Sequence, residues 1–116
     1  MQTEGHTVTN PLQRVRDNHE AQRLRRFARL KRRQLPASVQ DYTDRIASSI
    51  WAEYGDIGQA HAITEKIVRR DAESKGFDPQ TVILIIQLAL LIYQTLKRLN
   101  VMSPSTEMVT ALFEGE

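Results

Sequence analysis

The residues of this chain that could do chemistry are few and scattered. Histidine occurs only at His6, His19 and His61, far apart and without acidic neighbours at ligand spacing, and the chain contains no cysteine. Zinc sites need such ligands gathered at short, fixed spacings. The sequence therefore predicts no metal site and no cofactor.

Two pairs of carboxylates are the remaining candidates for acid–base chemistry, Asp41 with Asp44 and Asp71 with Glu73. Each pair lies in a charged helical segment, where we expect the side chains to face water. The five glycines do not gather into a loop that could hold phosphate. Because no nucleophile stands beside a base, the sequence predicts a non-enzymatic protein without a small-molecule substrate.

Charge recognition by arginine is the chemistry that the sequence does support. The first 35 residues contain nine Lys or Arg and three Asp or Glu, whereas the other 81 contain seven and eleven. A guanidinium group can bind two oxygens of a phosphate or a carboxylate at once. The pattern predicts a binding surface for nucleic acid or for an acidic protein partner, and leaves both open. Its residues are Arg23, Arg25, Arg26, Arg29, Arg32 and Arg33. Without zinc-finger or helix-turn-helix spacing, binding to nucleic acid would not be sequence-specific.

These arginines lie in a segment, residues 12–35, that is predicted to form an amphipathic helix ended by Pro36. At 100° per residue its apolar side chains share an arc of about 120°. They are Ala21, Leu24, Phe27, Ala28 and Leu35, with Lys31 inside the arc and Leu30 outside it. We expect a projecting basic arm that docks on protein through this arc. Residues 1–11 show no periodic pattern and are expected to be flexible.

Residues 38–116 are predicted to form the helical core and assembly domain. Ser38 is expected to cap one helix and Asp56 the next, and both helices carry apolar residues at spacings of three and four. Gly76 is expected to end the second of these in a left-handed conformation, with Phe77 adding an apolar contact. No strand-turn-strand pattern occurs, so the predicted fold class is all-α, a small helical bundle.

A helix over residues 79–100 is predicted to be the most apolar element. Asp78 is its expected N-cap, with a proline in the first turn. Between Val82 and Tyr93 the only polar residue is Gln87. A helix that is apolar all round must be covered, so we expect it to lie in the core and at a subunit interface. The residues predicted for self-association are Ile83, Ile86, Gln87, Leu90 and Tyr93.

The predicted function is that of a self-associating structural or assembly protein. A small virion component or a component of a nucleoprotein complex fits this description. A short helix over 105–113 is expected to close the core. Residues 1–10 lack the pattern of a secretory signal peptide, so the expected location is intracellular or in a virion. The alternative is a membrane-associated protein inserted through residues 81–99, although a span needs about 20 apolar residues and this run is shorter.

Overall fold

The structure is a computed structural model that describes residues 18–55, 59–101 and 104–114. Within these ranges the chain forms helices and no strand, so the predicted all-α fold is confirmed. The helices are α3 (His19–Arg33), α4 (Ala37–Tyr54), α5 (Ala60–Ser74), α6 (Pro79–Leu99) and α7 (Thr106–Phe113).

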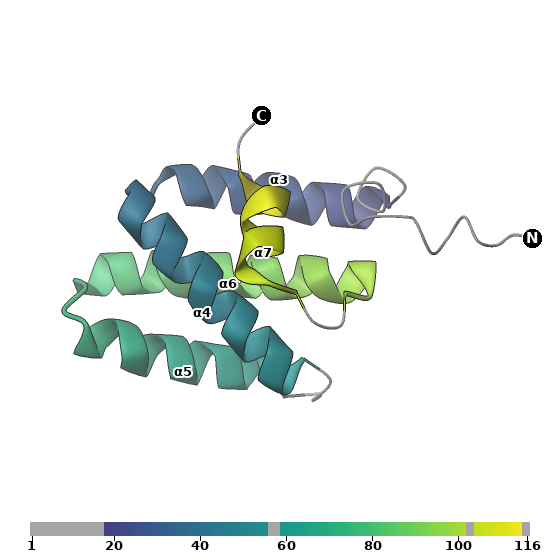
Figure 1. Ribbon diagram of the computed structural model, residues 1–116. Coiled ribbons are helices and arrows are strands. Elements are labelled where there is room, and N and C mark those ends of the chain that lie inside the picture. The colour runs from purple at the N-terminus through teal and green to yellow at the C-terminus, as the bar shows by residue number, and fades with distance from the viewer. Residues whose placement is uncertain (1–17, 56–58, 102–103, 115–116) are drawn as a thin grey trace, which may run out of the picture.

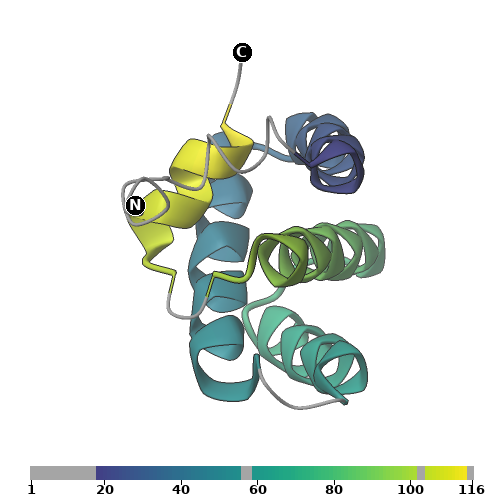
Figure 2. The ribbon, with the colours of Figure 1, turned by 90° about the vertical axis from the view of Figure 1, so that its right-hand side faces the viewer.

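The helices form two layers. In Figure 1, α3, α6 and α5 lie side by side with α6 in the middle, and α6 runs antiparallel to both neighbours. Figure 2 shows α4 and α7 covering one side of this layer. The core lies between the layers, where α6 buries four of the largest enclosed side chains, Ile85, Leu88, Ile92 and Leu96. The apolar character of α6 follows from this central position, because three helices pack against it.

The turn between α5 and α6 forms as its residues predict. Gly76 has a φ of 87°, the left-handed conformation that glycine adopts without strain. The Phe77 N–H donates to the Ala72 carbonyl at 3.2 Å, and the Gly76 N–H donates to the Glu73 carbonyl at 3.1 Å. These two bonds satisfy carbonyls left open at the end of α5. Asp78 then accepts a hydrogen bond from the Thr81 N–H and caps α6.

The start of α4 differs from the expectation. Ser38 does not cap the helix, which begins one residue earlier, directly after Pro36, without a side-chain cap. Gln40 closes this corner instead, because its amide donates to the carbonyls of Arg32 and Leu35 at 2.8 and 2.9 Å. The expected cap of the next helix, at position 56, lies outside the described residues.

The basic helix α3 is not confirmed as a projecting arm. It lies along α6 and also contacts α7, with Ala21, Leu24 and Ala28 buried. These three side chains form the stripe that packs against the neighbouring helices, and Phe27 lies outside it. Phe27 was expected in the buried arc and is instead 44% exposed. The expected helical start at residues 12–17 and the flexible residues 1–11 lie outside the described part.

Candidate interaction surfaces on α3 and α6

Three of the six predicted arginines lie on the outer surface of α3. Arg26 and Arg33 are exposed. Arg23 is also exposed, forms a salt bridge with Glu20 and lies 5.6 Å from the centre of the Phe27 ring. The hydrogen bond between the two charged groups lowers the pKa of the Glu20 carboxyl and raises the pKa of the Arg23 guanidinium. This surface therefore offers positive charge beside an aromatic ring.

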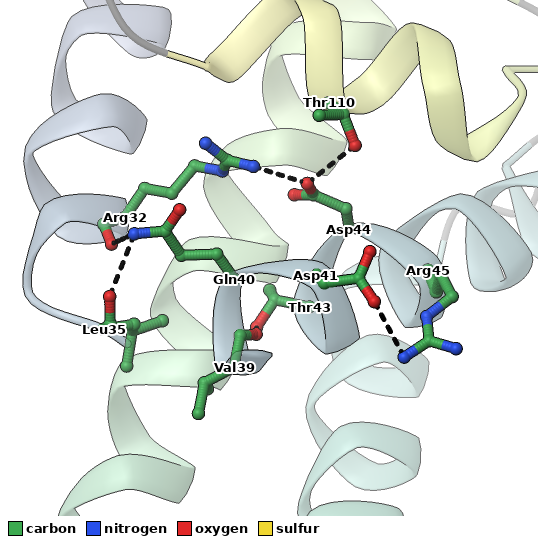
Figure 3. A network of polar contacts seen from close by, with 9 residues as sticks. All are labelled: Arg32, Leu35, Val39, Gln40, Asp41, Thr43, Asp44, Arg45 and Thr110. Carbon is green, nitrogen blue, oxygen red and sulfur yellow. Dashed lines mark hydrogen bonds and ion pairs between the residues drawn. The ribbon is translucent and has the colours of Figure 1, made fainter. Parts of the chain in front are cut away.

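Arg32 is not on that surface. Its side chain runs into the interior and forms a salt bridge of 2.7 Å with Asp44 on α4, whose carboxylate also accepts a hydrogen bond of 2.9 Å from Thr110 on α7 (Figure 3). Arg32 is 7% exposed and Asp44 is 0% exposed. The expectations that Arg32 faces outward and Asp44 faces water are both wrong, because each charge provides the partner that makes burial of the other tolerable.

Arg25 and Arg29 point toward α7. Both are half-buried. The Arg25 Nε–H donates to the backbone carbonyl of Leu112, near the end of α7. Because Arg25, Arg29 and Arg32 recur at spacings of four and three, they share one side of α3, and that side is covered by α4 and α7. A partner that binds these three residues would have to reach them on this partly enclosed side of α3.

The self-association residues predicted on α6 also divide between two sides of their helix. Ile83 is 47% exposed, Gln87 is exposed and Leu90 is half-buried. Their spacing of four and three residues makes one stripe on the outer side of α6, away from α4. Ile86 is only 6% exposed and belongs to the core. Tyr93 is half-buried against Trp51, with ring centres 5.0 Å apart.

A hollow of about 510 Å³ lies on the surface between α3 and α6. Its lining is Glu20, Leu24, Gln94, Lys97 and Arg98. Phe27 follows Glu20 by seven residues on the same side of α3, and Ile83 precedes Gln94 by eleven on the same side of α6. Phe27 and Ile83 therefore lie on the sides of α3 and α6 that border this hollow.

We call this surface the α3–α6 face and define it by Phe27, Leu30, Ile83, Gln87 and Leu90. Three of its members are the large apolar side chains that are exposed within the described residues. Positively charged side chains border it at the end near the hollow. The α6 residues of this face were predicted from the sequence. The two α3 residues were not, although Leu30 falls outside the apolar arc of its helix.

Two further observations bear on the other predictions. Of the described helices, α6 alone is long and apolar enough to cross a membrane, and half of its apolar window is buried against the rest of the protein. No group of three His, Asp or Glu side chains within the described ranges could hold a metal ion. His19 and His61 are exposed, and His6 lies outside those ranges.

Comparison with known proteins finds no family model, no curated protein and no solved structure that matches this chain. A function must therefore be argued from the chemistry and placement of its own residues. The most distinctive features in this respect are the exposed apolar side chains of the α3–α6 face and the arginines on either side of α3.

Proposed function

We propose that this chain is a non-enzymatic structural or assembly protein that self-associates through the α3–α6 face. The observation that supports this most is the exposure of the large apolar side chains of Phe27, Leu30 and Ile83, which are 44%, 50% and 47% exposed. Large apolar side chains that are exposed beside charged ones are typical of a protein contact surface. On α4, by contrast, the exposed residues include the charged Asp41 and Arg45, which interact well with water.

A second copy of the chain is the partner that fits this face. The outer stripe of α6 has an apolar residue on each side of Gln87, with Ile83 four residues before it and Leu90 three residues after it. If two copies of α6 meet antiparallel about a two-fold axis at Gln87, Ile83 of each lies within one residue of the level of Leu90 of the other. A Gln amide both donates and accepts, so the two copies of Gln87 can pair and fix the register.

The outward arginines of α3 extend this proposal to a second partner. Arg23, Arg26 and Arg33 are exposed beside the apolar residues, so a polyanion or an acidic protein surface could bind along the edge of the assembly. A small virion or nucleoprotein-complex component would combine these two activities. Binding to nucleic acid would be sensitive to salt and insensitive to sequence.

Light scattering over a range of protein concentrations tests the self-association. The proposal predicts a defined oligomer, and Phe27→Gln and Ile83→Gln should each weaken association about tenfold, the effect expected of a central interface residue. Ala52→Gln is the matched control, because Ala52 is exposed on the outer side of α4. A monomer at every concentration, or unchanged association of both face variants, would contradict the proposal.

The second candidate function is a membrane-associated protein inserted through residues 81–99. The length and hydropathy of α6 support it. Flotation with anionic liposomes separates the two candidates, because an assembly protein should remain in the soluble fraction without detergent. Flotation that Ile83→Gln abolishes would instead favour contact of the outer side of α6 with lipid.

A further inference from the structure

A small hollow on the α7 side of α3 is built largely from arginine. It has a volume of about 180 Å³. A cavity that holds one water molecule needs about 10–15 Å³, so this hollow has room for a small polyatomic ion. It lies on the other side of α3 from the α3–α6 face. Its lining residues are Arg29, Arg32, Arg33, Gln40, Phe113 and Glu114.

Two guanidinium groups in this lining carry buried donors that the described protein does not satisfy. The Nε atoms of Arg29 and Arg32 are both buried, and neither makes a hydrogen bond. Arg32 is more than nine-tenths buried and uses another nitrogen, Nη2, for its contact with Asp44. A buried N–H group without an acceptor costs free energy. Two such groups in one hollow are therefore rare unless a bound ligand or water accepts their hydrogen bonds.

The charges around the hollow leave an excess of positive charge. Arg32 is neutralised by Asp44, to which its Nη2 donates (Figure 3). Among the described lining residues, Arg29 and Arg33 remain, against the carboxylate of Glu114. An anion in the hollow would be attracted by this imbalance and would meet little screening, because two of the three guanidinium groups are partly or fully buried.

Gln40 gives the hollow a fixed wall. Its amide nitrogen donates to the carbonyls of Arg32 and Leu35, which ties the end of α3 to the start of α4. The backbone that carries Arg32 and Arg33 is thereby held in place before any ligand binds. Preorganised donors of this kind bind an anion with little loss of conformational entropy.

We propose that this hollow is a binding site for one tetrahedral oxyanion, a phosphate ion or the phosphate group of a monoester. The Nε–H groups of Arg29 and Arg32 donate to its oxygens from inside the hollow, and the Arg33 guanidinium neutralises charge at its edge. Glu114 opposes binding by charge repulsion. The site faces α7, so it is independent of the proposed self-association through the opposite side of α3.

The test measures affinity for inorganic phosphate by thermal shift and calorimetry at constant ionic strength, with chloride as the reference anion. Phosphate should raise the melting temperature in a saturable way. Arg29→Gln should weaken binding about tenfold or more, since it removes one charged donor. Arg70→Gln, the same change at an exposed position of α5 that has no proposed binding role, should leave the affinity unchanged.

Glu114→Gln provides a test of opposite sign that does not depend on a buried residue. Glu114 is exposed, so its replacement should keep the fold and strengthen phosphate binding several-fold by removing a like charge. Equal effects of phosphate and chloride, or equal phosphate affinity in Arg29→Gln and Arg70→Gln, would overturn the proposal.

A comparison of inorganic phosphate with O-phosphoserine identifies the source of the oxyanion. If the monoester binds as tightly as the free ion and is equally sensitive to Arg29→Gln, the hollow accepts a phosphate group carried by a larger molecule. If only the free ion binds, the hollow encloses it on all sides. Both results support an oxyanion site, and binding of neither would reject it.

Discussion

Arg32 and Asp44 join three helices through one carboxylate. Arg32 reaches it from α3, Thr110 from α7, and Asp44 itself belongs to α4 (Figure 3). The pair makes one charged contact, and Asp44 Oδ1 forms no hydrogen bond within the described residues. A buried pair of this kind adds little net stability over apolar side chains, but the loss of either partner leaves a buried charge. The pair therefore acts mainly to fix how the three helices meet.

We expect Asp44→Ala to lower the free energy of unfolding by about 3–5 kcal/mol, because Arg32 would remain buried without its partner. The double variant with Arg32→Met and Asp44→Leu should recover most of this loss. Urea denaturation measures both. Asp41→Ala is the control, since Asp41 forms an exposed salt bridge with Arg45 whose loss should cost less than about 1 kcal/mol. Equal costs for the two aspartates would disprove the buried pair.

Tyr42 provides a second polar contact between helices. Its hydroxyl donates to Asp71 on α5 at 2.6 Å, and its ring lies 5.2 Å from that of Phe77. Burial raises the pKa of the Tyr42 hydroxyl, and the hydrogen bond to Asp71 raises it further. The folded state thus favours the neutral phenol. This contribution to stability is complete below the unfolded pKa, about 10, and is lost as the pH rises above that value.

Tyr42→Phe should cost about 1 kcal/mol at neutral pH, the usual net value of one hydrogen bond. The same change should make the free energy of unfolding fall less steeply above about pH 10, because the group that titrates is gone. Denaturation series at pH 7 and above pH 10 test both parts. An identical pH dependence in the parent protein and Tyr42→Phe would show that Tyr42 ionises without a penalty in the folded state.

At the scale of elements, the ends of α5 and α6 are set by two residues with positive φ. Gly76 follows α5 with a φ of 87°, and Asn100 follows α6 with a φ of 56°. The N–H of Val101 donates to the Leu96 carbonyl in the same way that Phe77 closes α5. Glycine and asparagine are the residues that adopt this conformation at least cost. Local backbone geometry therefore ends both α5 and α6.

Gly76→Ala should destabilise the protein by about 1 kcal/mol, because an L side chain is strained at this φ. The cost would come from the backbone alone, since an added Cβ would meet no atom within 4 Å. Asn100→Gly is the matched variant, and it should be close to neutral because glycine accepts the same conformation. Thermal unfolding compares the two, and a Gly76→Ala protein more stable than its parent would contradict the assigned turn.

At the scale of the whole molecule, α6 has one side in the core and one side on the surface. Ile86 is 6% exposed, whereas Ile83, one turn earlier, is 47% exposed. The difference arises because α4, α3 and α5 cover three sides of α6 and leave its outer stripe open (Figure 2). An apolar helix in a chain of this size thus serves both the core and the α3–α6 face.

Ile86→Asp and Ile83→Asp should therefore have very different effects on folding. The first places a charge in the core and should cost about 3 kcal/mol or more, whereas the second should cost less than about 1 kcal/mol. Circular dichroism and urea denaturation measure this difference. Equal loss of stability in both variants would show that the outer stripe of α6 is enclosed as well.

The fold class and most helix ends could be predicted because their causes are local. Apolar residues at spacings of three and four, the Asp78 cap and Gly76 act within one turn of the backbone. The start of α4 was less predictable. Ser38 matches the local pattern of a cap, but Gln40 satisfies carbonyls at the end of α3, which only becomes possible when the two helices meet at a corner.

The sequence by itself determined that this chain is helical, that its arginines concentrate on one helix and that residues 79–100 contain its most apolar element. Only the tertiary structure decided that Arg32 is buried while Arg33 is exposed, and that Phe27 lies outside the core. The physical reason is that periodicity places side chains around a helix without stating which sides will be covered. That depends on Asp44 and on α7, distant in sequence, which reach α3 only in the folded chain.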